Sequence, residues 1–126
     1  MTVDLPDGRT GHANVIACVD SGAERSYLPL RIAARLGIQS LLTSNPEPSA
    51  GLGSTFETWV PPRPIKARIV AEFPEPQGRT LIGPELRLTP WFGEPEEFLL
   101  GRADFFQAFQ ITFDENPVAP LFHLDW

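Results

Sequence analysis

The sequence predicts an all-β domain, built as a small closed barrel or a sandwich. Fourteen prolines and ten glycines exclude a mainly helical protein, because both residue types interrupt helices. The apolar residues fall in many short runs separated by Pro- and Gly-containing turns, which is typical of short strands. At 126 residues the chain has the length of one domain, and we expect a single domain over residues 1–126.

The first half of the chain should begin with a hairpin and contain the clearest helix. Asp7 and Gly8 form a dipeptide that favours a tight turn, and the return strand is expected over residues 13–19, central and buried. Residues 28–36 combine apolar spacing of four with a proline near the start and a glycine after the end, which indicates a short helix. A Pro- and Ser-rich loop should then lead into a strand over 55–60.

The second half should consist of short strands with one or two helical turns. Strands are expected over 65–73, over 79–88 with an interruption at Gly83-Pro84, over 111–114 and over 121–124. An apolar run at 98–100 ends in Gly-Arg, and residues 103–109 suit the helical turns.

Composition limits the functions available. Sixteen acidic residues against ten basic ones give a formal charge of −6, which argues against a nucleic-acid partner. One cysteine, Cys18, excludes an intrachain disulfide and multi-Cys zinc sites, while His12 and His123 are expected to be structural. No membrane-spanning run or signal peptide is seen, so the sequence predicts a cytoplasmic protein with no membrane segment.

The segment Ala17-Cys18-Val19-Asp20-Ser21-Gly22-Ala23 carries the strongest chemical signal. An apolar strand is expected here, and it is followed directly by an aspartate and a turn of small residues. A carboxylate at the end of a buried strand is costly unless it accepts hydrogen bonds, and glycine lets backbone groups approach it closely. By itself, Asp-Ser-Gly is also consistent with an ordinary turn at a strand end.

The flanking residues resemble the retropepsin-like aspartic proteases, which include retroviral proteases and their cellular and bacterial relatives. Cys18 to Ala23 matches the family's pattern of two hydrophobic residues, Asp, Thr or Ser, Gly and Ala. Leu99-Leu100-Gly101-Arg102 matches its later apolar-apolar-Gly-Arg element, and Gly51-Leu52-Gly53 is the candidate flap tip. The resemblance implies a closed acid-protease β barrel with a flap hairpin, near residues 42–60, and one or two short helices.

The same resemblance implies a homodimer. The family's chemistry uses two aspartates on either side of a water, and this chain contains Asp-Ser-Gly once, so each protomer would contribute Asp20 as the catalytic residue. Two carboxylates about 3 Å apart share one proton, and one can activate water while the other protonates the scissile carbonyl. Such an endopeptidase acts on a polypeptide substrate and needs no cofactor or metal.

The resemblance also assigns the supporting residues. Ser21 and Gly22 would support the active site, and Glu24 and Arg102 would form a structural ion pair behind it. The residues expected to contact substrate are Cys18, Ala23, Gly51, Leu52, Gly53 and Leu99. For Cys18, a wall of the substrate cleft and a buried small apolar residue are equally consistent with the sequence.

The ends of the chain differ from the retroviral pattern. Because the first hairpin is predicted to begin almost at Met1, we expect no counterpart of that pattern's amino-terminal strand. We therefore expect residues of about 117–126 to form the dimer interface alone. Two other functions remain open: a catalytically silent retropepsin-like module for dimerisation or peptide binding, and an unrelated small β-barrel binding domain.

Overall fold

The computed structural model describes residues 1–51, 54–72, 76, 78–114 and 121–125. Short strands dominate these residues, with one α-helix and two 3-10 helices, so the predicted all-β class is confirmed at that level. No strand in the described part is longer than five residues. The same part contains no helix that is both long and apolar enough to cross a membrane.

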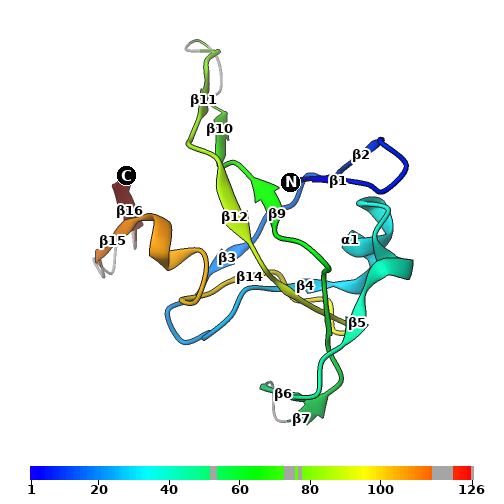
Figure 1. The fold of residues 1–126 in the computed structure, drawn as a ribbon. Helices are drawn as coiled ribbons and strands as arrows, with labels where there is room; N and C mark the ends of the chain where they lie inside the picture. The colour runs from blue at the N-terminus through cyan, green and yellow to red at the C-terminus, as the bar shows by residue number, and fades with distance from the viewer. Residues whose placement is uncertain (52–53, 73–75, 77, 115–120, 126) are drawn as a thin grey trace.

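The elements follow one another closely along the chain (Figure 1). The first eight strands are β1 (Thr2–Asp4), β2 (Thr10–His12), β3 (Cys18–Val19), β4 (Tyr27–Pro29), β5 (Thr43–Ser44), β6 (Ser49–Gly51), β7 (Ser54–Phe56) and β8 (Trp59–Val60). The remaining strands are β9 (Ile65–Ala67), β10 (Val70–Glu72), β11 (Thr80–Ile82), β12 (Leu86–Leu88), β13 (Trp91–Gly93), β14 (Leu99–Leu100), β15 (Gln110–Asp114) and β16 (Leu121–Asp125). The helices are α1 (Leu30–Arg35), η1 (Gln39–Leu41) and η2 (Phe106–Ala108).

Hydrogen bonding divides the described strands into five sheets. One sheet has the order β12-β9-β1-β2, and a six-stranded sheet has the order β3-β14-β4-β13-β8-β5. The other three are the hairpins β6–β7, β10–β11 and β15–β16, which extend from the body in different directions (Figure 1). The closed barrel expected from the sequence is not found among these sheets, because strands of two to five residues form ladders too short to close on one another.

The turn of the first hairpin and the break at Gly83-Pro84 are where the sequence predicts them. Gly8 has a φ of +85° between β1 and β2, and its N–H donates to the Leu5 carbonyl over 3.0 Å. The interruption at Gly83-Pro84 separates β11 from β12. The return strand expected over 13–19 is wrong, however, because β1 pairs instead with β2, at residues 10–12. Residues 13–17 form no strand, and Ile16 is 95% exposed. The strand is also not central and buried as expected, since β3 lies at one edge of the six-stranded sheet and Cys18 is exposed.

The predicted helix is shorter than expected because its first residues form a strand. Tyr27–Pro29 is β4, which pairs in parallel with β13, and α1 begins only at Leu30. Local spacing favoured the helix, but the partner strand lies more than sixty residues later in the sequence. Gly37, with a φ of +75°, ends the helical segment as expected.

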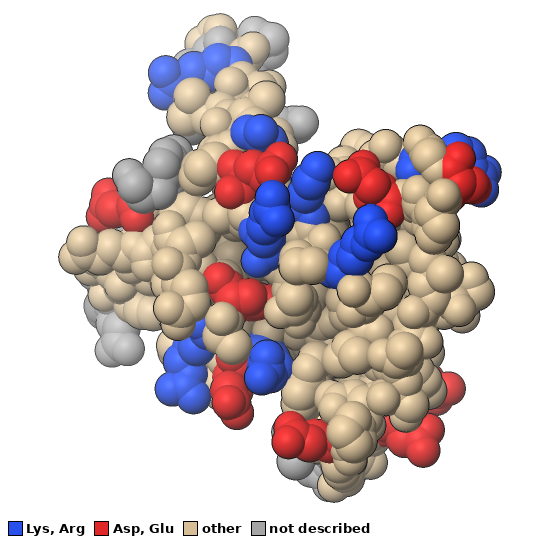
Figure 2. All heavy atoms as spheres, in the orientation of Figure 1, with Lys and Arg blue, Asp and Glu red and all other residues tan. Residues whose placement is uncertain are grey.

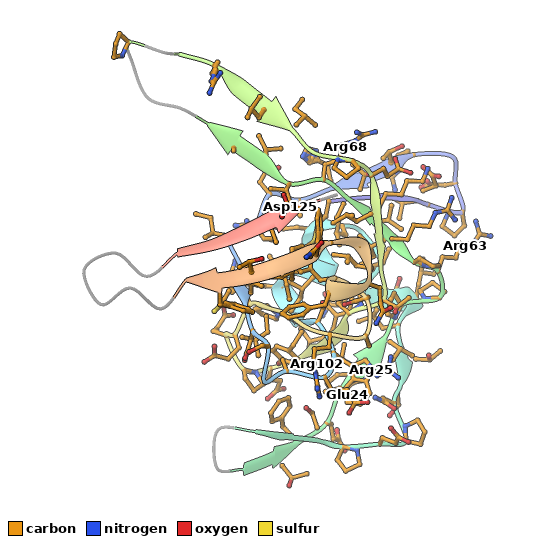
Figure 3. The ribbon with its side chains drawn as sticks, turned by 90° about the vertical axis from the view of Figure 1, so that its left-hand side faces the viewer. Glu24, Arg25, Arg63, Arg68, Arg102 and Asp125 are labelled. Carbon is orange, nitrogen blue, oxygen red and sulfur yellow. The ribbon has the colours of Figure 1, made fainter. Side chains whose placement is uncertain are left out.

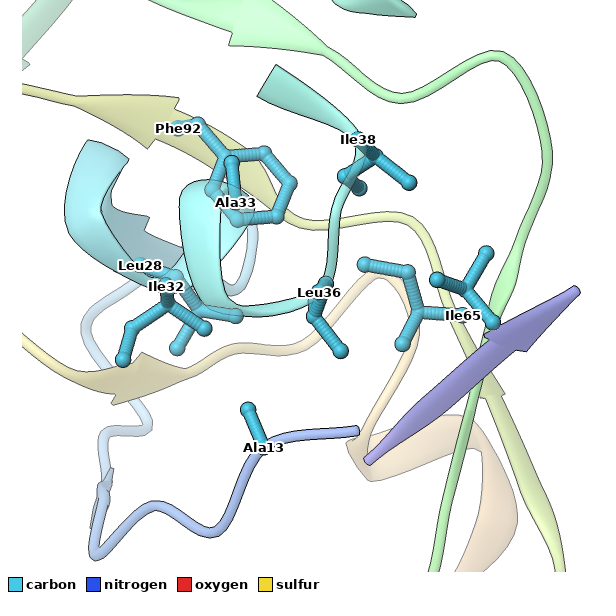
Figure 4. Packing of buried hydrophobic residues seen from close by; sticks show 9 residues of the cluster. Ala13, Leu28, Ile32, Ala33, Leu36, Ile38, Ile65 and Phe92 are labelled. Carbon is cyan, nitrogen blue, oxygen red and sulfur yellow. The ribbon is translucent and has the colours of Figure 1, made fainter. Parts of the chain in front are cut away.

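The core consists of two apolar clusters. The larger cluster packs Ile32 of α1, and Leu36 just after the helix, against Leu28, Ile65 and Phe92 (Figure 4). The second contains the buried residues Ala67, Leu86, Leu88, Phe105 and Phe109. Strands β9 and β12 bury alternating residues in the two clusters, so their intervening residues lie on the outer face of the sheet.

Tyr27 should make the fold sensitive to alkaline pH. The side chain is 6% exposed, and its hydroxyl donates to the Pro95 carbonyl over 3.1 Å. Burial, followed by the charges of Glu96, Glu97 and Glu94, raises its pKa above the usual value. The neutral phenol therefore stabilises the fold below about pH 10, where unfolded tyrosine ionises, and this stability is lost as the pH rises towards the folded pKa. Between about pH 8 and 11, the free energy of unfolding in urea should fall less in Tyr27→Phe than in the wild type. An equal fall in the two proteins would contradict this role of Tyr27.

Candidate active site

Two segments that are eighty residues apart in the sequence meet at the end of β3. Strand β14 lies between β3 and β4, parallel to the former and antiparallel to the latter. In the register, Leu99 is opposite Cys18 and Leu100 is opposite Val19. The N–H of Asp20 then donates to the Leu100 carbonyl over 3.0 Å. The strand pairing therefore fixes the backbone of Asp20 against the start of the Gly-Arg element.

The Asp20 carboxylate lies at the surface of a tight turn. Its Oδ1 accepts a hydrogen bond from the Gly22 N–H over 2.8 Å, and its carbonyl accepts one from the Ala23 N–H over 3.2 Å. The residue is half-exposed. A Cβ at position 22 would lie 3.2 Å from Oδ1, so glycine is what allows the close approach. The carboxylate is held by its own turn and still open to solvent.

The loop after Asp20 is bound by backbone hydrogen bonds to the residues after β14. The Arg102 N–H donates to the Ala23 carbonyl over 3.0 Å, and the Ala103 N–H donates to the Glu24 carbonyl over 2.7 Å. Gly101 packs directly onto this loop, where an added Cβ would overlap the carbonyl carbon of Arg25. Glycine is therefore required at position 101.

A buried hydroxyl and a carboxylate connect this loop to a third segment. The Ser26 hydroxyl donates to Asp104 Oδ1 and accepts from the Gly101 N–H over 3.1 Å. Asp104 also accepts hydrogen bonds from the N–H groups of Phe105 and Thr89, over 2.7 and 3.1 Å. Sequence reasoning placed Asp104 next to the Gly-Arg element and gave neither it nor Ser26 a role, since the signal is a contact between residues 78 positions apart.

Replacing Asp104 should destabilise the fold. Asp104→Ala removes the acceptor for three donors and leaves the hydroxyl of Ser26, which is 1% exposed, without this partner. We expect the free energy of unfolding to fall by about 2 to 4 kcal/mol, as for the loss of a buried charge-assisted network. The free energy of unfolding should fall less in Asp104→Asn, because an amide keeps one acceptor oxygen. Urea unfolding checks both variants, and an Asp104→Ala loss below about 0.5 kcal/mol would contradict the assignment.

The remaining predicted contact residues are distributed around Asp20. Cys18 and Ser21 are exposed, whereas Ala23 and Leu99 are half-buried. The exposure of Cys18 differs from the buried alternative, although β3 does place it on the same face as Asp20.

The expected ion pair behind the site is replaced by backbone contacts in the described residues. Figure 3 shows Glu24 and Arg102 near one another, and the main chains of these segments are hydrogen-bonded. No ion pair between the two side chains is among those of the described residues. The next residue after Glu24, Arg25, has its guanidinium carbon 5.5 Å from the centre of the Trp91 ring.

The flap prediction falls partly on described residues. β6 and β7 form an antiparallel hairpin in which Gly51 is paired with Ser54. Tyr27 and Phe56 make an edge-to-face contact, with ring centres 5.5 Å apart, which joins the base of this hairpin to β4. Leu52 and Gly53 lie outside the described residues, as do residues 117–120 and 126 of the expected dimer segment.

Comparisons with models of protein families, with curated proteins and with solved structures find no match to this chain. A fixed, solvent-accessible carboxylate can accept a proton from water and so act as a general base.

Proposed function

We propose that this protein is an aspartic endopeptidase that acts as a homodimer. The observation that carries the proposal is the pairing of β3 with β14, which joins the two sequence elements that resemble retropepsin-like proteases. Cys18-Val19-Asp20 and Leu99-Leu100-Gly101 are separate signals in the sequence, and their strands are paired residue by residue. A chance match to either motif would not require this contact.

The proposed site contains Asp20 from each of two protomers. One carboxylate accepts a proton from the water between them as that water attacks the scissile carbonyl carbon. The other, protonated carboxyl donates its proton to the carbonyl oxygen, giving a neutral tetrahedral diol. The carboxyl that took the water proton then donates it to the leaving nitrogen, while the other carboxylate accepts a proton from one hydroxyl of the diol. The C–N bond breaks, and a carboxylic acid and an amine are released. The pair titrates as a unit because two adjacent carboxylates resist a second ionisation.

Neighbouring residues supply the remaining parts of this mechanism. Gly22 holds the Asp20 carboxylate through its N–H, and Ser21, which is exposed on the same turn, would contact the second protomer. Cys18, Ala23 and Leu99 form the surface on which the substrate backbone would lie. The β6–β7 hairpin is the proposed flap, whose closure would exclude water from the reacting peptide bond.

Cleavage of a peptide library tests this function. The wild-type protein should cut internal peptide bonds, as seen by mass spectrometry of the products, and a peptide with a hydroxyethylene group in place of the scissile bond should inhibit it as an analogue of the tetrahedral intermediate. A protein that dimerises or binds peptides and cuts none of them would instead be the silent module.

Removing the carboxyl-terminal hairpin strand should give an inactive monomer. β16 pairs with β15 along its whole length, and Leu124 packs against the second core cluster. A chain that ends at Asp114 lacks this strand and the proposed dimer segment. Sedimentation velocity should show a dimer for the full chain and a monomer for the truncated one, with circular dichroism reporting whether the remaining strands fold. A truncated chain that stays dimeric and active would contradict the assignment of the interface.

A further inference from the structure

The outer face of the β12-β9-β1-β2 sheet gathers positive charge on an acidic protein. Val3, Ile65, Ala67, Leu86 and Leu88 of its strands are buried on the core side. The alternate residues, which include Lys66 and Arg87, lie on the other face. Figure 2 shows blue side chains next to one another over β9 and β12, although the chain carries a net charge of −6.

The sheet register places two of these cations directly opposite each other. Lys66 on β9 is the partner of Arg87 on β12, so both side chains leave the same face of adjacent strands. Like charges at such positions destabilise a sheet unless an anion lies between or beside them. The Lys66 Nζ is 3.4 Å from Asp4 Oδ2, whereas Arg87 forms no ion pair within the described residues.

A third cation approaches from the segment that precedes β9. Arg63 lies between Pro62 and Pro64, which restrict the backbone on both sides of it. Its side chain is exposed and, like that of Arg87, has no ion pair in the described part of the chain.

These three cations line one cavity. Its volume is about 320 Å³, and its lining residues are Val3, Asp4, Arg63, Pro64, Lys66 and Arg87. The lining carries three positive charges and the one negative charge of Asp4, so its formal net charge is +2. Guanidinium groups form paired hydrogen bonds to phosphate oxygens, and a phosphate monoester carries close to two negative charges near neutral pH.

We propose that this cavity binds a phosphate monoester group. The site goes beyond the proposed peptidase function and does not depend on it. Arg63 and Arg87 donate hydrogen bonds to the phosphate oxygens, Lys66 supplies a further positive charge, and Asp4 weakens binding by repelling the anion and occupying Lys66.

Titration with inorganic phosphate at about pH 8, where the dianion predominates, tests the site by calorimetry and by the NMR signals of the arginine side chains. One phosphate should bind per chain.

Arg63→Gln and Arg87→Gln should each weaken phosphate binding about tenfold, the effect of one charge-assisted hydrogen bond. Asp4→Asn should tighten it about threefold, since it removes a repelling charge from the exposed site. Arg35→Gln, an exposed arginine at the end of α1, is the matched control and should bind like the wild type.

The opposite signs expected for the Asp4 and arginine variants separate specific binding from loss of folding. Weaker binding by Asp4→Asn, or unchanged binding by both arginine variants, would overturn the proposal. Succinate that binds as tightly as phosphate would overturn the assignment to phosphate. Glycerol phosphate and a phosphoserine tripeptide distinguish a small-molecule source from a polypeptide source, and at least one should bind as tightly as inorganic phosphate. Weaker binding of both would overturn a phosphate monoester as the ligand.

Discussion

Asp20→Asn is expected to abolish peptide cleavage while leaving the fold intact. In the proposed mechanism the pair of Asp20 carboxyls performs all the proton transfers, so its replacement by amides removes both the base and the acid. We expect kcat/KM to fall by at least about a thousandfold, the effect of losing general acid–base catalysis. The half-exposed amide that replaces the carboxylate can still accept the Gly22 N–H through its oxygen, so the free energy of unfolding should change by less than about 1 kcal/mol.

The control for this variant is Asp7→Asn, which removes the same charge from an exposed turn. Asp7 accepts hydrogen bonds from Arg9 and lies in the β1–β2 turn, away from β3. Cleavage rates measured on one library peptide should be those of the wild type in this control. Equal cleavage by Asp20→Asn and the wild type would show that another group performs the reaction, even if the retropepsin-like fold were correct.

Gly101→Ala should cause a large loss of stability. The new Cβ would overlap the carbonyl carbon of Arg25 and lie 2.5 Å from its carbonyl oxygen, and both are backbone atoms. Relief of this clash must separate the Gly-Arg element from the loop after Asp20 and break the hydrogen bond from Gly101 to Ser26. We expect the free energy of unfolding to fall by about 3 kcal/mol or more, together with any cleavage activity.

Gly83→Ala is the matched control for that experiment. Gly83 is also buried, yet its added Cβ would lie 3.5 Å from the nearest atom, the Ile69 carbonyl oxygen, which is an ordinary contact. Its free energy of unfolding should stay within about 1 kcal/mol of the wild type. Urea unfolding of both variants compares them directly, and equal stabilities would contradict the close packing of Gly101 on the Arg25 backbone.

Local sequence signals predicted the features that depend on neighbouring residues. Asp7-Gly8 marked the first turn, Gly37 marked the end of the helical segment, and Gly83-Pro84 marked the break between β11 and β12. Each depends on backbone angles that glycine or proline favours, so a few residues suffice to predict it. The end of β3 at Asp20 was predicted for the same reason.

Features that depend on distant partners were missed. Most of β4 falls within the predicted helix, because its pairing with β13 involves residues far along the chain. Of the strand predicted over 13–19, residues 13–17 form no strand, since β-branched composition alone does not provide a neighbouring strand. The contact of Ser26 with Asp104 likewise joins residues 78 positions apart, and neither side chain belongs to a local pattern.

The central claim is that two Asp20 carboxyls, one from each protomer, form one active site. Mixed dimers test it most directly: wild-type and Asp20→Asn chains are unfolded together, refolded at known ratios, and assayed for cleavage of one peptide. The proposal predicts that activity falls with the square of the wild-type fraction, so an equal mixture keeps about one quarter of it, because only dimers with two aspartates are active. Activity that falls in direct proportion to the wild-type fraction would mean that each protomer works alone, which would contradict a shared site.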